Sequence, residues 1–402
     1  MKAHIFRSLA ILRWSMRLPL DHDDEPPDLD RPQEQRALIG LSLVPGVGAS
    51  RMRALLAHFD APSAVFRASR SALTKVDGVG DQTAEAILTF EDREAVQQEM
   101  QRADTLDATL ISPWDERFPE RLREIYDPPG FLWMRGTLPE AARPMVTIVG
   151  TRRCTDYGRA QAHHFGAELA RKGFTVVSGL AYGIDAAAHK GALDAGGRTL
   201  AVLGSGVGNV YPQKHTALAE RIEQNGAVLS EYAIDADPDA PNFPERNRIL
   251  SGLALGTLVV ESYSEGGALI TARLALEQNR EVFALPGAIT KDSSIGTNRL
   301  IQRGHAKLVM DLEDLLEELP DVTVEEPDEV DAETVAGTKP DPTADLEGKE
   351  KVLYETLADT PVHIDELCAE VDMDPSTALV HLLELEFKGL VRQLAGKQFR
   401  RA

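Results

Sequence analysis

Six short apolar runs between residues 145 and 310 constrain the fold of this chain more than any other feature. The first covers residues 145–149 and ends at Gly150, and the others read TVVSG, TLAVLG, AVLSEY, GTLVVES and EVFALPG. A helical segment accompanies each run. Strands that alternate with helices in this way are typical of a parallel, doubly wound sheet. The sequence therefore predicts a Rossmann-like, mostly parallel α/β domain over residues 145–319.

The loops that follow these strands predict a site for phosphate groups. In such sheets the ligand crevice lies at the carboxyl ends of the strands. The first loop, GTRRCTDYG, brings backbone N–H groups, a hydroxyl and a guanidinium to a helix start, which suits a phosphate better than a surface salt bridge. The candidate contacts in this and the later loops are Gly150, Thr151, Arg152, Arg153, Ser178, Gly179, Gly183, Lys214, Arg246, Asn247, Arg248, Gly266, Gly267 and Thr271.

Two further patterns in this domain have more than one interpretation. Asp185 and His189 lie one helical turn apart, which suits acid–base or metal chemistry, or else a helix cap with a hydrogen-bonded histidine. We favour the cap because no third ligand or nucleophile is close in sequence. Gly204, Gly206 and Gly208 are spaced G-x-G-x-G, whereas the dinucleotide fingerprint is G-x-G-x-x-G. The sequence therefore predicts no cofactor and no metal.

Residues 36–105 predict a helical domain organised around two similar glycine turns. The stretches VPGVGASRMRALL and VDGVGDQTAEAIL each open a helix after an apolar-x-Gly-apolar-Gly turn. The pair resembles a tandem helix-hairpin-helix (SAM-like) module, in which amides at a helix start approach a DNA phosphate. The alternative is a helical bundle whose glycines only form tight turns, and Asp77 and Asp81 beside the second turn favour it.

The remaining segments are assigned from composition. Residues 1–35 read as a disordered lead-in, and residues 106–144 as a connector that packs on the core, although its aromatic residues could also stack on bases. Residues 320–349 are acidic and proline-bearing, which predicts a flexible linker. Residues 350–402 show three helical segments and a hairpin, the order of a winged helix. For this last unit, partner docking and DNA contact both stay open.

Charge distribution decides what the net charge of −21 means for binding. Residues 311–350 carry a net charge of −14, whereas residues 145–310 carry +1. The α/β domain is therefore neutral overall, and a local positive site is what binding to phosphates requires. Two cysteines far apart, Cys154 and Cys368, fit a reducing cytoplasm. Because no apolar run approaches 18 residues, we expect no membrane span.

Motifs spread along most of the chain carry a family resemblance. They are VGTRRCTDYG, VVSGLAYGIDAAAH, AVLGSGVGNVYPQKH, LSEY, FPERNRILSGLA, VVES, GGALITARLALEQNREVFALPG and GTNRLIQRG. Together they resemble the DNA-processing protein A (DprA/Smf) family over roughly residues 36–320. The resemblance implies a non-enzymatic protein of natural transformation that binds and protects incoming single-stranded DNA. It also implies a homodimer through the Rossmann-like domain, which loads the RecA recombinase and displaces single-strand-binding protein.

The resemblance also assigns residues. The family's Gly-Ser/Thr-Arg loop holds the DNA backbone and is matched by Gly150, Thr151 and Arg152, while Lys214 is the candidate basic residue after Tyr-Pro. The chain departs from the family at His215, where asparagine is usual. It departs again at GGALIT, which lacks two hydroxyls of Ser-Gly-Ser-Leu-Ile-Thr.

An enzyme is the rival interpretation. Related α/β proteins of the lysine-decarboxylase-like group bind nucleotides or cleave their N-glycosidic bonds, and they resemble each other by a Pro-Gly-Gly-x-Gly-Thr loop. The comparable stretch here, ESYSEGGALITAR, lacks that loop. Although Glu261, Glu265 and Asp185 lie in or near the crevice, they form no obvious catalytic pair. We therefore favour the binding protein.

Overall fold

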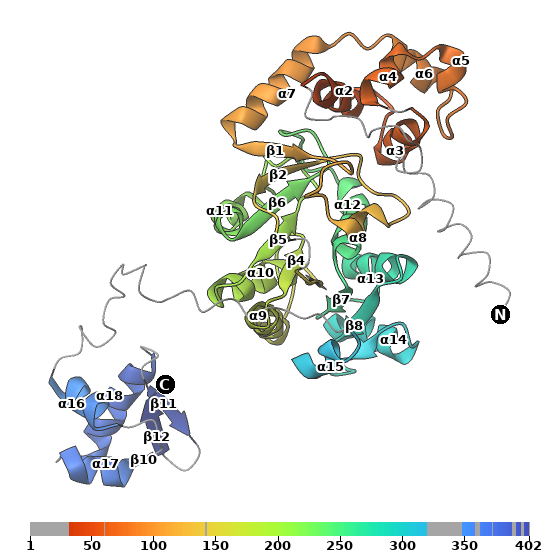
Figure 1. Ribbon diagram of the computed structural model, residues 1–402. Coiled ribbons are helices and arrows are strands. Elements are labelled where there is room, and N and C mark those ends of the chain that lie inside the picture. The colour runs from red at the N-terminus through yellow and green to blue at the C-terminus, as the bar shows by residue number, and fades with distance from the viewer. Residues whose placement is uncertain are drawn as a thin grey trace. The chain divides into compact units, whose positions relative to one another are not determined.

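A computed structural model describes residues 32–59, 61–140, 143–319, 348–357, 362–371, 373–387, 391–394 and 398–401 (Figure 1). The chain divides into two compact units, residues 1–327 and 328–402, and each is considered by itself. Helix α2 begins at Pro32, within the predicted lead-in. Residues 1–31 of that lead-in and residues 320–347 of the predicted linker lie outside the described residues.

A nine-stranded sheet forms the centre of the first unit. Its order is β1-β2-β6-β5-β4-β3-β7-β8-β9, and all neighbours from β6 to β9 are parallel. Strands β1 and β2 extend one edge in antiparallel orientation. This topology confirms the predicted doubly wound sheet. The strands are Ala108–Ile111, Leu132–Gly136, Met145–Val149, Thr175–Ser178, Thr199–Val202, Gly226–Ser230, Gly256–Val259, Glu281–Ala284 and Lys307–Leu308.

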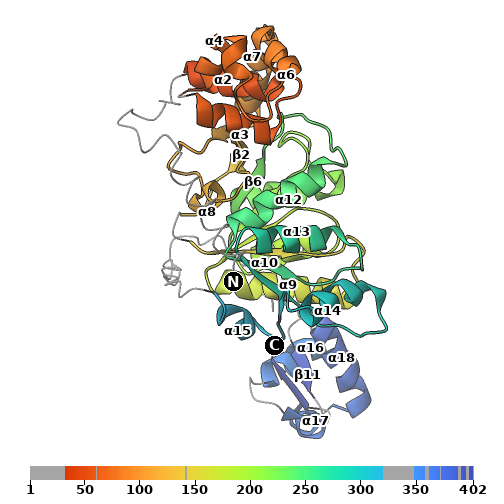
Figure 2. The same ribbon diagram turned by 90° about the vertical axis from the view of Figure 1, so that its right-hand side faces the viewer.

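Helices cover both faces of this sheet (Figures 1 and 2). Helices α9, α10, α11 and α15 pack on one face, while α8, α12 and α13 pack on the other, and α14 packs beside β8. The bounds are α8 Glu120–Arg123, α9 Asp156–Arg171, α10 Ile184–Asp194, α11 Thr216–Gln224, α12 Asn242–Leu253, α13 Gly267–Glu277, α14 Ile295–Gln302 and α15 Leu312–Leu316; the short 3-10 helices are η2 Gln213–His215 and η3 Asp292–Ser294.

Successive side chains along each strand point to opposite faces of the sheet, so they divide the core into two clusters. In β3, Val146 and Ile148 join the cluster under α9 and α10, whereas Met145 and Val149 join the one under α12 and α13. Successive side chains of a strand point to opposite faces, so a strand buried on both sides must be apolar throughout. The continuous apolar runs in the sequence follow from this requirement.

The N-terminal helices form a module with an internal repeat. Each glycine turn ends in an extended N-cap glycine, Gly48 before α3 and Gly80 before α6. The residues two positions earlier, Gly46 and Gly78, have φ values of +85° and +76°. Glycine enters this left-handed region without steric cost, which explains its place in both turns. The helices are α2 Pro32–Leu43, α3 Ala49–His58, α4 Pro62–Arg67, α5 Arg70–Leu73, α6 Asp81–Leu88 and α7 Arg93–Thr105.

One arginine connects the two turns of this repeat. Arg51 donates from Nε to the carbonyl oxygen of Gly78 at 2.8 Å and from Nη1 to that of Gly46 at 2.6 Å. A guanidinium suits this role because its donors have a fixed geometry. The module and the α/β domain share an apolar cluster, and a bidentate ion pair between Arg102 and Asp235, with a shortest distance of 2.6 Å, adds a polar contact between them.

The second unit has the element order of a winged helix, as predicted. Its elements are α16 Gly348–Thr356, β10 Val362–His363, α17 Ile364–Val371, α18 Pro375–Phe387, β11 Val391–Leu394 and β12 Gln398–Arg401. The strands form a sheet in the order β10-β12-β11. Leu353, Leu367, Leu382 and Phe399 are buried in its core. Within the described residues of both units, none of the helices combines the length and apolar character needed to cross a lipid bilayer.

The second glycine turn yields a test of this backbone geometry. Gly78→Ser should lower the free energy of unfolding by about 1–2 kcal/mol, because a side chain is strained in the left-handed region. Gly80→Ser is the matched control. Gly80 is extended, with φ −87° and ψ 177°, and no atom lies within 4 Å of an added Cβ, so serine fits and can cap α6. Urea denaturation measures both variants, and equal destabilisation would contradict the assignment.

Candidate functional site

The candidate site lies where the strand order reverses. Chain order runs from β3 outward to β6 on one side and from β7 to β9 on the other, so the loops after β3 and β7 diverge at this point. Ligands of open α/β sheets bind at such a switch point. Here the Thr151 amide donates to the carbonyl oxygen of Glu261 at 2.8 Å, which fixes the start of the GTRR loop against the end of β7.

Glu261 holds the two diverging loops together with its side chain as well. Its carboxylate is 2% exposed and accepts hydrogen bonds from the Thr155 amide at 2.9 Å and the Thr155 hydroxyl at 2.7 Å. The Ser293 hydroxyl donates to it at 3.2 Å. Thr155 in turn accepts the Gly158 amide and caps helix α9. This buried carboxylate therefore fixes the helix start that the predicted phosphate loop leads into.

The loop after β4 contains a residue in an unfavourable conformation. Leu180 has a φ of +57°, a region that residues with a side chain rarely adopt. Asp185 accepts the Gly179 and Ala181 amides on either side of it, and Arg246 donates to the Gly179 carbonyl at 3.1 Å. The Leu180 carbonyl oxygen lies 2.8 Å from His215 Nδ1. Such strain persists only where surrounding groups over-determine the backbone, as these do.

The loops after β3 and β4 are in direct contact. Gly183 has a φ of +79°, and a Cβ at this position would lie 2.4 Å from the carbonyl oxygen of Thr151. A Cβ on Gly150 would lie 2.4 Å from Ile184. Glycine is therefore required at both positions by close packing of the two loops. Their packing brings the predicted Gly150–Thr151 and Gly179–Gly183 segments together in one crevice.

Three predicted cations are exposed in these loops. Arg152 and Arg153 follow β3 and Lys214 follows β5, and within the described part of the chain no carboxylate is paired with any of them. The Arg153 amide donates to the Thr151 hydroxyl at 3.1 Å. The Arg152 guanidinium lies over the ring of Phe243, 4.9 Å from its centre. The side chains of Arg152, Arg153 and Lys214 are thus available to an anion.

Four other predicted contacts are buried, and the side chains of Ser178, Arg246 and Arg248 are hydrogen-bonded within the fold. Arg248 forms a bidentate pair with Glu231 at 2.5 and 2.6 Å, and the Ser178 hydroxyl donates to the Ile148 carbonyl oxygen. Arg246 is 4% exposed and Thr271 is 1% exposed. We therefore reassign Ser178, Arg246, Arg248 and Thr271 from ligand contact to support of the loops and core, because side chains enclosed by the fold cannot reach a ligand.

The other predicted positions are partly accessible. Asn247 is half-buried, and its side-chain oxygen accepts from Arg246 at 3.4 Å. Gly266 is the N-cap of α13 and Gly267 its first residue, and no atom lies within 4 Å of a Cβ added to Gly267. The structure thus leaves the start of α13 open. Helix N-termini attract anions, so Gly266 and Gly267 stay candidates.

Sequence reasoning missed Phe243. This residue lies in the first turn of α12 and fills the space beside Gly204, where a Cβ would approach its ring to 2.9 Å. A phenylalanine next to Pro244 and two arginines was a signal for an aromatic–cation contact. The glycines of GSGVGN have a similar explanation, since a Cβ on Gly206 would lie 2.0 Å from the Ile234 carbonyl oxygen. They serve close packing.

Asp185 and His189 are held by other groups. The Thr199 hydroxyl donates to the Val176 carbonyl oxygen, so it accepts the Nδ1–H of His189 at 2.7 Å. Burial, together with the nearby His215 and Arg246, lowers the pKa of His189 to about 3. The imidazole is therefore neutral at physiological pH and enclosed in the core. The structure supports the hydrogen-bonded histidine, but the predicted helix cap is wrong. Gly183 is the N-cap of α10 and no side chain caps it, whereas Asp185 accepts the amides of the preceding loop.

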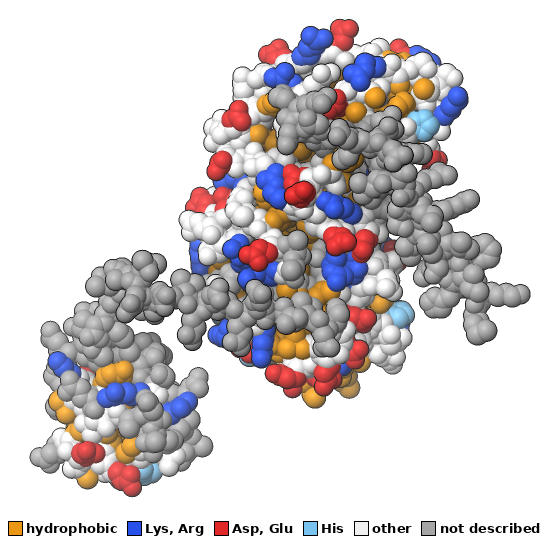
Figure 3. Space-filling model, viewed as in Figure 1, with side chains coloured by type: hydrophobic (Ala, Val, Ile, Leu, Met, Phe, Trp, Pro, Cys, Tyr) orange, Lys and Arg blue, Asp and Glu red, His pale blue; other side chains and the backbone are white. Residues whose placement is uncertain are grey.

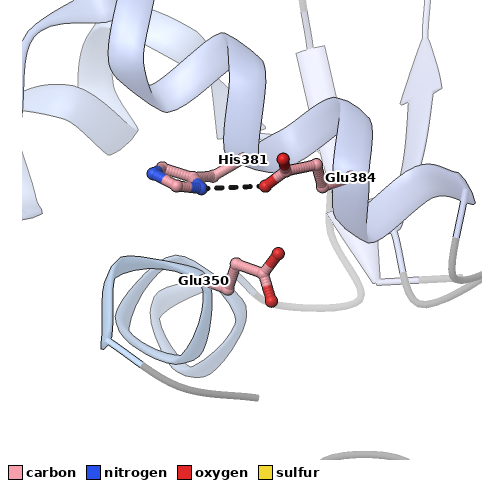
Figure 4. Close-up of side chains that lie close together, drawn as sticks. All are labelled: Glu350, His381 and Glu384. Atoms are coloured by element: carbon pink, nitrogen blue, oxygen red, sulfur yellow. Dashed lines mark hydrogen bonds and ion pairs between the residues drawn. The ribbon is translucent and has the colours of Figure 1, made fainter. Parts of the chain in front are cut away.

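In the described residues, one group of three side chains has the proximity of metal ligands. Glu350 of α16 and His381 and Glu384 of α18 have ligand atoms within 4.8 Å of one another (Figure 4). His381 Nδ1 already lies 3.0 Å from Glu384 Oε2 in an ion pair along the helix. Glu384 is exposed, so solvent can satisfy its remaining lone pairs. The ion pair between His381 and Glu384 explains why these side chains lie close together, without a metal ion.

The fold and the loops define a class, which comparison narrows to a family. A doubly wound sheet with exposed cations at its switch point, a helix-hairpin-helix module and a winged helix define a multidomain α/β protein with a candidate site for phosphate groups. Family models match residues 109–320 as DNA recombination-mediator protein A, residues 37–90 as a SAM-like helix-hairpin-helix tandem, and residues 337–397 as the DprA winged helix domain. The chain belongs to the DprA/Smf family.

Individual relatives agree with this assignment. The chain is 33% identical to Protein Smf of Synechocystis, over 92% of this chain and 99% of that protein. It is 42% identical to DNA processing protein DprA of Bacillus subtilis, over 52% of this chain and 71% of that protein. The crystal structure of DprA from Streptococcus pneumoniae superposes with a TM-score of 0.62 at 32% identity, covering 71% of this chain and 98% of that one.

Replacing the buried carboxylate tests its role in the crevice. Glu261→Gln should lower the free energy of unfolding by about 1–3 kcal/mol, because an amide has one acceptor oxygen where the carboxylate has two. Glu265→Gln is the control, since Glu265 is exposed in the same loop and should change stability by less than about 0.5 kcal/mol. Urea denaturation compares the two, and equal effects would show that Glu261 contributes no special restraint.

Proposed function

We propose that this protein has a DNA-processing role and binds single-stranded DNA through the crevice at the β3–β7 switch point. The observation that carries the proposal is the exposed, unpaired Arg152 beside the loop amides at the sheet's carboxyl edge. Membership of the DprA/Smf family supports it. In this proposal Gly150, Thr151, Arg152, Arg153 and Lys214 contact the phosphates.

The distribution of charge supports binding at a local site. On the face that Figure 3 shows, basic and acidic side chains are interspersed over the first unit. Such a surface gives little long-range attraction, so affinity depends on the contacts within the crevice. Each phosphate contacted should add roughly −0.7 to the slope of log affinity against log salt for a single strand. Backbone contacts of this kind carry no sequence information, and we expect little sequence preference.

We also propose that the protein is non-catalytic. The carboxylates of the crevice serve other purposes, since Glu261 accepts three hydrogen bonds and Asp185 accepts two amides. Both carboxylates are buried and bonded to groups of the loops, which is a structural role rather than that of the general base that N-glycosidic cleavage requires. Incubation with nucleoside monophosphates tests this directly, because release of free base would overturn it.

Family membership supports a proposal for the partners of the protein. We propose a homodimer through the Rossmann-like domain that protects incoming DNA in natural transformation, loads the RecA recombinase and displaces single-strand-binding protein. We place it in the cytoplasm, which its two free cysteines support. A dimer should survive deletion of everything after Leu319, because the α/β core is complete at α15. Light scattering decides this, and a monomeric truncation would locate the contact in the second unit.

Substituting the two neighbouring arginines tests the phosphate loop. Arg152→Ala should weaken single-strand binding roughly ten- to a hundredfold, the equivalent of a charged hydrogen bond of about 1.5–3 kcal/mol. Arg153→Ala should have a much smaller effect. The Phe243 ring orients Arg152 before binding, so little side-chain entropy is lost there. Fluorescence anisotropy measures both affinities, with circular dichroism as a check of folding. If Arg152→Ala binds like the unaltered protein, the loop is misassigned.

A further inference from the structure

An array of aromatic side chains borders Arg152. The guanidinium of Arg152 lies over the Phe243 ring. This ring packs against Tyr211, with ring centres 5.8 Å apart. On the neighbouring loop, Tyr182 meets the ring of His215 edge to face at 5.0 Å. Tyr211 and His215 belong to the same loop after β5. Loops from β3, β4 and β5, together with the start of α12, thus contribute to one array.

The two tyrosines of this array present ring surface to solvent. Tyr182 is 41% exposed and Tyr211 is 40% exposed. Neither hydroxyl has a hydrogen-bond partner among the described residues. In contrast, Phe118, Phe131 and Trp133 of the connector are buried, so base stacking is closed to those three. Exposed rings that border a cation in a crevice offer a surface to a ligand that is partly flat and apolar.

An unpaired nucleobase attached to a phosphate has this chemistry. Bases stack on aromatic side chains, and every base offers a flat face. A guanidinium that stacks with its face keeps its in-plane N–H groups for phosphate oxygens, so Arg152 can contact Phe243 and the backbone together. In a duplex the base faces are covered by their neighbours. We propose that Tyr182 and Tyr211 stack on unpaired bases of a strand whose phosphate is held at Gly150–Arg152, an inference that rests on the proposed function.

Comparison of two oligonucleotides tests this proposal with the full chain. One is a deoxythymidine homopolymer and the other an abasic strand of equal length, so that only the first offers bases. Tyr182→Leu and Tyr211→Leu should each weaken binding of the thymidine strand by roughly five- to a hundredfold, the equivalent of losing one stacked base. Binding of the abasic strand should not change. Tyr211→Phe keeps the ring and should bind both strands like the unaltered protein.

Two further variants distinguish failure of the stacking proposal from failure of the proposed function. Tyr126→Leu is the control, because Tyr126 is 84% exposed but follows α8, outside the loops at the carboxyl ends of the parallel strands. It should leave both affinities unchanged. Arg152→Ala should weaken both strands, since both carry phosphates. If the tyrosine variants weaken neither strand, or both equally, the stacking proposal is overturned. If the unaltered protein binds neither strand, the proposed function itself fails.

Discussion

The geometry of the crevice depends on one buried carboxylate at the point where the sheet diverges. From the central pair β3 and β7, the sheet is built outward in opposite directions. The loops after these two strands therefore lead into different helices, α9 and α13. Glu261 supplies the missing connection by bonding Thr155 at the start of α9 and Ser293 in η3. A buried carboxylate is costly unless it accepts hydrogen bonds, and here donors from the loops after β3 and β8 supply them. Arg152 and Arg153 lie between Thr151 and Thr155, and Glu261 bonds both of these flanking residues.

The sequence determined the architecture more fully than the site. Apolar runs that alternate with helices were sufficient for the parallel sheet, and the end of each run located its loop. The burial of Arg246 and Arg248 could not be predicted from the sequence in the same way. Both arginines are followed by Ile249 and Leu250, but the partner of Arg248 is Glu231, which lies 17 residues away. Only the packing of α12 shows that this stretch of the helix is enclosed.

Basic residues in this protein therefore divide into two populations that composition cannot separate. Arg246 and Arg248 are buried and hold backbone and carboxylate groups in place. Arg152 and Arg153 are exposed and unpaired within the described residues. An overall charge of −21 reports neither population. It is also compatible with binding to a polyanion, because more than half of the negative charge lies outside the α/β domain that bears the crevice.

The bridge formed by Arg51 couples the two halves of the helical repeat. Repeated turns usually stack as independent copies, each stabilised by its own local contacts. Here one side chain satisfies a carbonyl oxygen in each copy, so a disturbance of either turn also removes a contact from the other. The two hairpins thus form a single cooperative element with a fixed mutual orientation. Anything that engages one helix start meets the second at a predetermined distance and angle.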